Sequence, residues 1–576
     1  MKKILAAGAI ALALGITFAA CSDDDYSDKD APSVTVSLVR NGNRSVRIEF
    51  EPEDSDFDHV CVYDCNGKLL GQSNAGENFW EGSDFKNEEG VQLYISSVDK
   101  DGNESAREGV AAFPTEHNKY MVAYFKSDSN GNSSYESLFL GYSEDGLNYT
   151  ALNNNKYVYK VNTADTSGGA CVRDCYVARL HDYEISGDGT TLTLRDAGKS
   201  QFAYLATDWT NYGNSSYTKE EYGTIGSTSY WGGSQSPSII VSLINVDTKA
   251  DSVAIVKPHS PSTTGSICQR LVTLNLGTMG RGSQMHAWAP EMVIDYNDDG
   301  TPKPVANVGG VNYYYGIIWS GAGNIPTYIK GKPIDAKNED GTGYYGWSFV
   351  DGIPTFDPNV EVSSCSWSTG TIKNIDKFKY HTENDVYDES GKLVEDKNTT
   401  YDGTNRTYIS YTNDFITVTG PFLWFQNDYT GSIVTEIDAS VIKVDGKFYM
   451  FFKNEAGGVD ITQTVSSSLM PGSFKVMNGG RYVTRGEDQS TQTGVEGPWI
   501  INGTDGNWWL YGDNYNAGSV TGTKNFLGTA TTVIDASAKN WVKHDNDVYS
   551  FPAGVRHAIA FRVTEEELNV FKNKKW

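Results

Sequence analysis

The sequence has little positive charge gathered in one place. Its 47 Lys and Arg residues are outnumbered by 73 Asp and Glu residues, the formal net charge is −26, and the basic cluster that stands out is the terminal KNKKW. A chain this acidic repels a phosphate backbone, so we expect no nucleic acid partner. Neutral sugars carry no charge to be repelled and are commonly held by aromatic faces, carboxylates and amides, so the composition permits a carbohydrate ligand.

Cysteine is scarce, with 7 in 576 residues, and after Cys21 the thiols stand at positions 61, 65, 171, 175, 268 and 365. The segments CVYDC and CVRDC lack the short second Cys or His pair that a zinc site needs. Thiols four residues apart in an extended strand also lie too far apart to bridge. We therefore expect small buried residues or halves of long-range disulfides, whose pairing the spacing leaves open.

The apolar run at the N-terminus is too short for a confident membrane span. MKKILAAGAIALALGITFAAC has two lysines, an apolar run and small residues before Cys21, which is the layout of a secretory signal. FAAC resembles a bacterial lipobox, and SDDDYSDKD resembles the acidic export tract of Bacteroidetes surface lipoproteins. This resemblance implies a signal peptide over residues 1–20, lipidation of Cys21 and an acidic tether over 21–32. The exported protein would then be anchored to the outer membrane, on the cell surface or the periplasmic side; the alternative is plain signal cleavage with Cys21 a spectator.

Aromatic residues and glycine are abundant. The chain has 35 Tyr, 23 Phe, 13 Trp and 59 Gly, a mixture that favours many short strands joined by turns over long helices. We therefore predict an all-β chain, with two or more structural units because 576 residues exceed one ordinary domain.

Residues 33–115 are predicted to form a small β-sandwich. SVTVSLV, SVRIEFEP and later segments alternate apolar and polar residues and are separated by Asn, Asp and Gly turns. DKDGNES follows the last long strand and resembles the closing hairpin of fibronectin type III domains, an immunoglobulin-like fold. The resemblance implies a spacer or binding module without chemistry of its own.

Residues 116–576 repeat one pattern five times. An aromatic strand such as YMVAYF, YYYGIIWS or FYMFFKNE is followed by a second strand, and a shorter strand such as APEMVID or DASVIKV leads four of these units. Strand repeats of about forty residues or more indicate radial architecture, so we predict a five-bladed β-propeller. The C-terminal HAIAFRV would lead the first unit and close the ring. A polar insertion over roughly residues 321–405 is expected on the rim.

Five side chains stand at the start of the leading strands, namely Asp174, Glu291, Asp438, Glu496 and His557. Inner strands of a propeller line its central channel, so these residues are predicted to converge on one pocket. Crowded carboxylates drive at least one to hold its proton, and we expect Glu496 to be that one. A protonated acid beside an ionised partner is the arrangement that glycoside hydrolysis requires, and a carboxyl separation of about 6.5–9.5 Å gives inversion.

The motifs GGACVRDCYVARL, HAWAPEMVID, IDASVIKVDGKFYMFFKNE, VEGPWIIN and VRHAIAFRVTEEE, in this order, resemble the blade motifs of glycoside hydrolase family 43. This family comprises five-bladed propellers that act with inversion on arabinose-, xylose- and some galactose-containing polysaccharides. The resemblance implies that Asp174 is the general base, Glu496 the general acid and Asp438 the residue that orients the acid and tunes its pKa. It further implies α-L-arabinofuranosyl or β-xylosyl linkages in arabinan, arabinoxylan or a similar plant polysaccharide as the substrate, and we expect a monomer.

Three further residues match family positions. Trp288 and Glu291 match a segment that shapes the substrate pocket, and His557 matches a histidine near a central metal ion or water. No cofactor is expected to be required, and the resemblance allows a structural calcium ion. One departure concerns Cys175, which follows Asp174 where the family usually has proline, so the backbone at the base has more freedom.

Alternative explanations remain at the level of sequence. A carboxylate before a strand often caps a turn, although capping does not predict acids at corresponding places in separate repeats. A glycan-binding lipoprotein without catalysis could use the same pocket. The presence of all three carboxylates, Asp174, Asp438 and Glu496, favours an enzyme. A retaining enzyme on fructose polymers would need a nucleophilic aspartate in an N-terminal ND-type motif, which we do not find.

Overall fold

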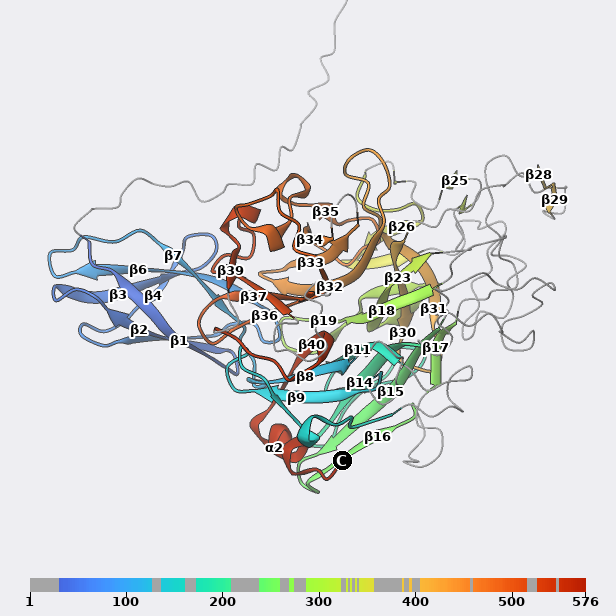
Figure 1. Cartoon of the computed structure of the whole chain (residues 1–576), viewed down its shortest axis with the longest axis horizontal. Coiled ribbons are helices and arrows are strands. Elements are labelled where there is room, and N and C mark those ends of the chain that lie inside the picture. Colours follow the sequence, from blue (N-terminus) through green and yellow to red (C-terminus); the bar gives the residue numbers. More distant parts are fainter. Residues whose placement is uncertain are drawn as a thin grey trace, which may run out of the picture.

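The computed structural model describes most of the chain in separate stretches. They cover residues 31–126, 136–160, 172–208, 238–258, 269–273, 286–322, 341–356, 405–455, 459–514, 526–544 and 548–576, with short pieces between 328 and 338 and between 386 and 395. These stretches are built of β-strands and contain one α-helix, α2 (Glu565–Asn573) (Figure 1). The prediction of a nearly all-β chain is confirmed.

Residues 31–115, here called the N-terminal unit, form two antiparallel sheets around a shared core. One sheet has the order β1-β2-β5 and the other the order β4-β3-β6-β7. The core between them includes Val46, Ile48, Leu93 and Trp80. The strands are β1 (Val34–Gly42), β2 (Ser45–Pro52), β3 (Phe57–Tyr63), β4 (Leu69–Gln72), β5 (Phe79–Ser83), β6 (Val91–Asp99) and β7 (Glu108–Ala112).

Five larger sheets follow, and each is a row of antiparallel strands that begins with one strand here called its first strand. The first sheet contains β40 (Val555–Val563), β8 (Lys119–Lys126), β9 (Phe139–Ser143) and β10 (Thr150–Ala151). The second contains β11 (Val172–Arg179), β14 (Lys199–Asp208), β15 (Ser238–Asp247) and β16 (Ser252–Val256), with β17 (Gln269–Thr273) also paired to β15. The third contains β18 (His286–Val293), β23 (Tyr315–Ala322), β30 (Arg406–Thr412) and β31 (Thr419–Phe425).

The fourth sheet contains β32 (Glu436–Val444), β33 (Lys447–Asn454), β34 (Asp460–Ser466) and β35 (Lys475–Val476). The fifth contains β36 (Val495–Asn502), β37 (Trp508–Asn514), β38 (Phe526–Thr531) and β39 (Val542–His544). Short 3-10 turns lie at η1 (Asn153–Asn155), η4 (Asn478–Gly480), η5 (Val483–Arg485) and η7 (Ala538–Asn540).

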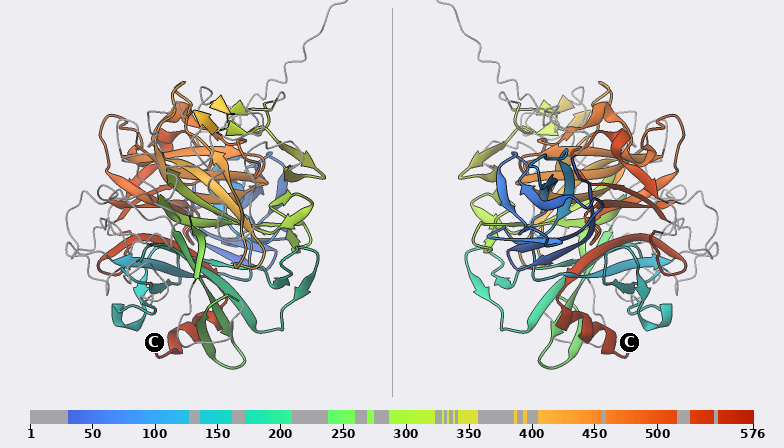
Figure 2. Two further views of the ribbon diagram at one scale, coloured as in Figure 1. Left: turned by 90° about the vertical axis from the view of Figure 1, so that its right-hand side faces the viewer. Right: turned by 90° about the vertical axis from the view of Figure 1, so that its left-hand side faces the viewer.

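The five first strands contact one another in a closed cycle. β40 contacts β11, β11 contacts β18, β18 contacts β32, β32 contacts β36, and β36 contacts β40. The cycle closes because β40, at the C-terminal end, pairs antiparallel with β8, at the other end of this part of the chain. The predicted pairing of HAIAFRV with the first aromatic strand is thereby confirmed. Figure 2 shows β40 (red) lying beside β8 (blue) near the middle of the molecule.

Aromatic side chains fill the space between neighbouring sheets. Trp499 of β36 and Tyr511 of β37 lie 4.6 Å apart between ring centroids. Tyr149 and Phe551 from the adjoining loops stack on each other, and both contact Trp499 edge-on. Strands whose residues are buried on both faces must carry apolar side chains on both faces. This explains why the second strands appear in the sequence as unbroken aromatic runs.

The predicted insertion is described in part. Its strands β26 (Trp347–Val350) and β27 (Ile353–Phe356) form a hairpin that pairs in parallel with β21 (Ala306–Val308), next to β22 (Val311–Tyr313). Trp347 contacts Phe422 of β31 at 5.0 Å between ring centroids. The remaining short strands are β12 (Tyr183–Ile185), β13 (Leu192–Leu194), β19 (Asp295–Tyr296), β20 (Pro302–Lys303), β24 (Tyr328–Ile329), β25 (Lys332–Pro333), β28 (Val386–Tyr387) and β29 (Leu393–Glu395). Most of residues 357–404 lie outside the described stretches.

The described cysteines are free thiols. Cys61, Cys65 and Cys175 form no disulfide, and Cys61 and Cys175 are the small buried residues that we predicted. Cys21, Cys171, Cys268 and Cys365 lie outside the described residues, as do the signal and tether segments. Lipidation of Cys21 therefore stays a prediction.

None of the described helices has the length and apolar character needed to cross a membrane.

Helix α2 ties the closing strand to the second sheet. Thr564 accepts a hydrogen bond from the Glu567 N–H while the Glu567 carboxylate accepts one from the Thr564 N–H, which forms a capping box. The same carboxylate receives two guanidinium nitrogens of Arg179 at 2.9 Å. Burial raises the pKa of Glu567, but the charge and hydrogen bonds of Arg179 outweigh it and hold the pKa below its usual range.

We predict that Arg179→Met destabilises the fold by about 3 kcal/mol, because it leaves the buried Glu567 carboxylate without its cation. Urea unfolding would measure the loss. The double variant Arg179→Met/Glu567→Gln should recover part of it, since a neutral amide can still accept the Thr564 bond. An equal loss in both variants would mean that the charge pair is not the cause.

Candidate active site

Each of the five first strands has the same kink at the same position. The kinked residues are Asp174, Ala289, Asp438, Gly497 and His557, with φ of 52°, 48°, 58°, 54° and 29°. At each kink two residues of the first strand face one residue of the second strand, as the shift of register shows. A bulge of this kind bends the strand and redirects the side chain. Because the first strands form a ring, the five kinks face a common region.

This register corrects the predicted alignment of the site residues. Asp174, Asp438 and His557 occupy equivalent positions, as expected. Ala289 stands at the kink where we expected Glu291, which lies two residues further along β18. Gly497 stands at the kink where we expected Glu496, which precedes it. Acidic residues in the sequence do not mark the kink, because the backbone conformation repeats irrespective of side-chain type.

Asp174 is held by a threonine and faces a histidine. The Thr207 hydroxyl donates to Asp174 Oδ2 at 2.7 Å and accepts from the Ala289 N–H at 2.9 Å, which links two neighbouring kinks. His557 Nδ1 lies 3.4 Å from Asp174 Oδ1. Burial lowers the pKa of His557, but the charges of Asp174, Asp438 and Glu496 more than offset this and raise it above the usual range. The imidazolium therefore balances part of the negative charge.

Asp438 is the most enclosed of the three carboxyl groups Asp174, Asp438 and Glu496, at 7% exposure. Its Oδ2 accepts a hydrogen bond from the Gly497 N–H at 3.0 Å, and its own N–H donates to Ser320 Oγ at 2.9 Å. Burial, together with the negative charges of Glu496 and Asp174, raises the pKa of Asp438 from 3.8 to about 7, against the opposing effect of His557. The Asp438 carboxyl can therefore hold a proton near neutral pH.

Glu496 lies between two cations. Lys453 Nζ of β33 donates to Glu496 Oε2 at 3.0 Å, and an Arg556 guanidinium nitrogen lies 3.6 Å from Glu496 Oε1. Arg556 also donates from Nε to Asp513 Oδ2 at 2.5 Å. Burial raises the pKa of Asp513 to about 6; Arg556 opposes this rise, and Glu496 adds to it. Glu496 is part of a network of alternating charges.

Gly497 is required at its kink for two reasons. Its φ of 54° is unfavourable for residues with a side chain. A Cβ at this position would also lie 2.8 Å from His557 Nδ1. The imidazole of His557 therefore occupies the space that a side chain at position 497 would need.

Glu291 and Trp288 differ in exposure. Glu291 is 7% exposed, and its carboxyl hydrogen-bonds with Ser440 and the Val441 N–H of β32. Burial raises the pKa of Glu291 well above its usual range, which favours the neutral acid. It joins β18 to β32 and is not an open pocket residue. Trp288 precedes the kink and is half-buried, so a contact with substrate remains a prediction.

Four residues of the site were not predicted from the sequence, namely Lys453, Arg556, Asp513 and Thr207. Arg556 adjoins His557 in VRHA and Lys453 lies in FFKNE, both within quoted motifs. Single residues in strands give no signal of their own, because their partners come from other sheets. Cys175 is 1% exposed and lies 3.6 Å from the Tyr204 hydroxyl, so the residue that replaces proline is a core residue.

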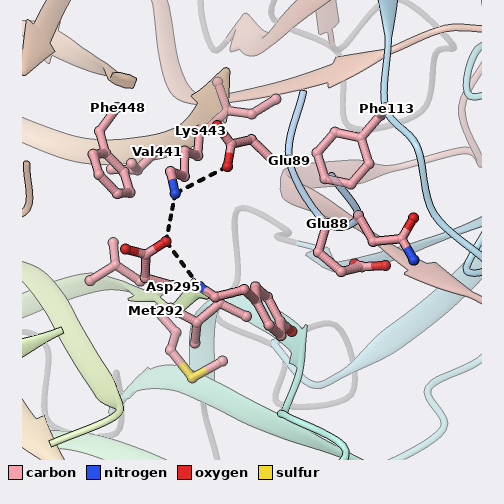
Figure 3. A pocket seen from close by; sticks show the side chains of 13 residues that line it. Glu88, Glu89, Phe113, Met292, Asp295, Val441, Lys443 and Phe448 are labelled. Carbon is pink, nitrogen blue, oxygen red and sulfur yellow. Dashed lines mark hydrogen bonds and ion pairs between the residues drawn. The ribbon is translucent and has the colours of Figure 1, made fainter. Parts of the chain in front are cut away.

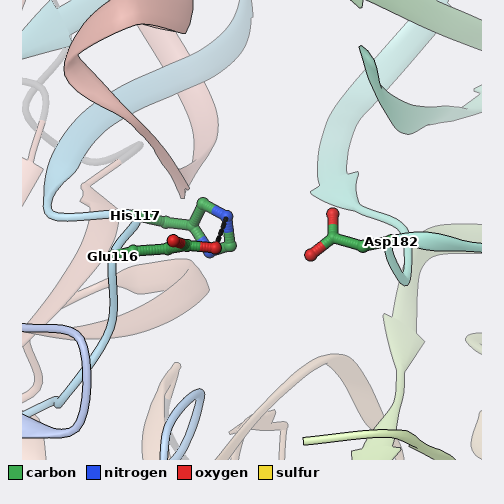
Figure 4. A group of neighbouring side chains, drawn as sticks. All are labelled: Glu116, His117 and Asp182. Atoms are coloured by element: carbon green, nitrogen blue, oxygen red, sulfur yellow. Dashed lines mark ion pairs between the residues drawn. The ribbon is translucent and has the colours of Figure 1, made fainter. Parts of the chain in front are cut away.

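A metal ion next to His557 stays a prediction. The carboxylates of Asp174, Asp438, Glu496 and Asp513 act on His557. Two of them, Glu496 and Asp513, already pair with Arg556, whereas calcium takes six to eight oxygen ligands. A different group in the described residues, Glu116, His117 and Asp182, has its ligand atoms within 4.8 Å of one another (Figure 4). His117 Nδ1 there already lies 3.0 Å from Glu88 Oε1.

The arrangement of Asp174, Asp438 and Glu496 has the components of acid–base catalysis. Three carboxyl groups from three different sheets influence one another electrostatically, and a histidine lies among them. Their environments differ, since Asp438 is buried whereas Glu496 and Asp174 are 27% and 16% exposed in their side chains. Pairs of acids in different environments are typical of enzymes that protonate one atom and deprotonate another.

Comparisons with known proteins indicate a class of enzyme. A family model described as a probable glycosyl hydrolase domain, related to glycoside hydrolase family 43, matches residues 364–569. This segment includes Asp438, Glu496 and His557 and excludes Asp174. No curated protein matches the chain.

Several solved structures of family 43 enzymes share weak similarity. An α-L-arabinofuranosidase from Clostridium thermocellum has 12% identity and a TM-score of 0.31, with 81% of this chain and 95% of that chain covered. An α-L-arabinofuranosidase from Lactobacillus brevis has 10% identity and a TM-score of 0.29, with 76% and 94% covered. A family 43 β-1,3-galactosidase has 10% identity and a TM-score of 0.22, with 85% and 95% covered. These scores are low, so the fold rests on the sheets described above.

The raised pKa of Asp438 predicts a pH effect on stability. Between about pH 4 and pH 7 the folded chain keeps a proton that the unfolded chain releases, so stability from this group is present at low pH and is lost as the pH rises. The stability of wild type relative to Asp438→Asn should therefore fall by up to about 1.4 kcal/mol per pH unit between pH 5 and 7.

Chemical unfolding at several pH values would test this prediction. Asp188→Asn is a suitable control, because hydrogen bonds from Ser186 and Thr190 lower the pKa of Asp188 and its contribution should be constant in this interval. A difference between wild type and Asp438→Asn that does not change with pH would contradict the assignment.

Proposed function

We propose that the protein is an inverting glycoside hydrolase that cleaves α-L-arabinofuranosyl or β-xylosyl linkages in plant polysaccharides such as arabinan or arabinoxylan. Galactosyl linkages are a related option, since one similar structure is a β-1,3-galactosidase. The observation that carries the proposal is that Asp174, Asp438 and Glu496, from three sheets, lie in one electrostatically coupled cluster. The family model over residues 364–569 supports the same class.

In this mechanism Glu496 protonates the leaving oxygen and Asp174 removes a proton from the attacking water. Thr207 and His557 orient Asp174 through the contacts at its two oxygens. Asp438, fixed by the Gly497 N–H, orients the segment that carries Glu496 and influences its charge. The raised pKa of Asp438 places an exchangeable proton beside the acid.

The architecture proposed for this activity is a five-bladed β-propeller. The closed cycle of five first strands supports it, with each of the five sheets as one blade. The two sheets of the N-terminal unit support a preceding fibronectin type III-like sandwich. We further propose export, anchoring to the outer membrane through Cys21 and a monomeric state. A structural calcium ion stays a prediction without a role in the mechanism.

Glu496→Gln should reduce kcat/KM by at least about 100-fold on glycosides with poor leaving groups and much less on activated aryl glycosides, because only the former need a proton donor. Asp174→Ala should reduce both. Circular dichroism and thermal unfolding would show that both variants fold. Full activity of Glu496→Gln on a poor leaving group would rule out its role as the acid.

The stereochemical outcome tests the mechanism directly. Arabinan, arabinoxylan, galactan and aryl glycosides would be incubated with the protein, and proton NMR would identify the anomer first released. We expect inversion. Release of the retained anomer would exclude the mechanism, and sugar binding without any product would identify a glycan-binding protein.

A further inference from the structure

The N-terminal unit is joined to the turn between β32 and β33. This turn has the residues Asp445 and Gly446, both with positive φ. The Gly90 N–H donates to the Lys443 carbonyl at 2.9 Å, and the Asp445 N–H donates to the Gly90 carbonyl at 3.0 Å. Glu89 accepts a hydrogen bond from the Gly446 N–H. The turn is therefore paired with the backbone that enters β6.

The unit is also joined to the turn between β36 and β37. The Val39 N–H donates to the Thr504 carbonyl at 2.6 Å, and the Ala111 N–H donates to the Gly506 carbonyl at 2.8 Å. Trp508, at the start of β37, is fully buried against Gly90. Two neighbouring sheets of the ring are thus held by one unit from the end opposite the kinks.

Gln92 connects both attachments. Its backbone N–H donates to Asp445 Oδ2 at 2.9 Å, on the fourth sheet. Its side-chain Oε1 accepts from Trp508 Nε1 of β37 and from the Ile534 N–H, both at 3.1 Å. Its Nε2 donates to the Thr532 carbonyl at 2.8 Å and to the Leu93 carbonyl at 3.2 Å. Thr532 and Ile534 follow directly after β38, so these partners belong to the fifth sheet and its adjoining loop. Gln92 is 3% exposed, so these bonds are shielded from water.

Two glycines allow this close approach. A Cβ at Gly90 would lie 2.6 Å from Trp508 and 2.8 Å from Val444, and a Cβ at Gly109 would lie 2.5 Å from Val533. Next to Gly90, Lys443 pairs with Glu89 at 3.1 Å and with Asp295 at 2.7 Å across a cavity of about 180 Å³ (Figure 3). The contact surface is shaped for a fixed position, which a flexible spacer would not need.

We propose that the N-terminal unit is a positioning element of the active site, with Gln92 as its central positioning residue. The unit holds the turns that follow the C-terminal ends of β32 and β36. The same strands carry Asp438 and Glu496 close to their N-terminal ends. The two strands also meet at the kinks, where the Gly497 N–H donates to Asp438. Holding both turns in place restricts the sliding and rotation of β32 relative to β36.

The catalytic part of this inference rests on the proposed function. Acid catalysis depends strongly on the position of the donor, and a displacement of about 1 Å can reduce the rate by about 100-fold. Movement of β36 relative to β32 would therefore affect proton donation by Glu496 before it affects sugar binding. Loss of the contacts between the N-terminal unit and the two turns should then lower the rate most for those substrates that most need a proton donor.

The test uses Gln92→Met in the full chain. Methionine has a similar volume and keeps the backbone bond to Asp445, but it removes the three side-chain bonds to the fifth sheet. Gln72→Met is the matched control, since Gln72 is an exposed residue of β4 whose side chain donates to Cys61 Sγ within the same unit. Amide hydrogen exchange and glycosidase kinetics would be measured for both variants.

We expect faster exchange in Gln92→Met at the two turns and at the Gly497 N–H, with no change there in Gln72→Met. The ratio of kcat/KM on a poor leaving group to that on an activated aryl glycoside should fall about threefold or more, which corresponds to about 0.7 kcal/mol of lost transition-state stabilisation. Unchanged exchange in β32 and β36 would overturn the proposal. Hydrogen exchange needs no enzymatic activity. An absence of hydrolysis in wild type would therefore refute the proposed function, while the exchange data would still test whether the N-terminal unit holds β32 and β36.

Equal losses on both substrates would refute the catalytic part, even if exchange increases, because a merely structural defect lowers both rates together. Gln92→Glu provides a second variant in case Gln92→Met folds poorly. It retains an acceptor for Trp508 and Ile534 and loses the donor to the Thr532 and Leu93 carbonyls, so the ratio should fall less than in Gln92→Met.

Discussion

The kink shared by the five first strands is the constraint on which the candidate site depends. A regular strand directs successive side chains to opposite faces, so it could not turn one residue from each sheet toward the ring axis. The left-handed residue and the extra residue beside it redirect the chain at the same level in each sheet. Positive φ is unfavourable for Asp and His, and the surrounding sheets hold these residues in it.

Charge balance is the second requirement at the kinks. Asp174, Asp438 and Glu496 would repel one another if no cation were present. Lys453 and Arg556 pair with Glu496, and His557 faces Asp174. The cations come from β33 and β40, so the electrostatic balance exists only after the sheets have assembled. Asp438, the most enclosed of these three carboxyl groups, is the one whose pKa rises to about 7.

The two ends of the ring have different roles. At one end, the kinks bring together the carboxylates and cations of the candidate active site. At the other end the N-terminal unit covers the turns of the fourth and fifth sheets through backbone hydrogen bonds, Gln92 and close glycine contacts. This contact gives the unit a structural relation to the site that its fold alone would not indicate, because sandwich domains also serve as simple spacers.

How much could be predicted from the sequence depends on the range of the interactions involved. Strand composition and alternation are local, so the all-β class, the aromatic second strands and the pairing of HAIAFRV with the first unit followed from the sequence, and the structure contains them. Asp174, Asp438 and His557 were placed at equivalent positions for the same reason, since each opens a recognisable strand. The alignment of Glu291 and Glu496 with them was wrong by register, because a bulge is a property of backbone pairing that acidic residues do not mark.

The sequence by itself determined the order of the strands, the excess of acid and the candidates for catalysis. Only the tertiary structure decided which acid is enclosed, which cations neutralise the others and how the N-terminal unit contacts the ring. Burial and charge pairing depend on side chains that lie far apart along the chain and on different sheets. Their distances are set when the ring closes, and no local pattern of residues contains them.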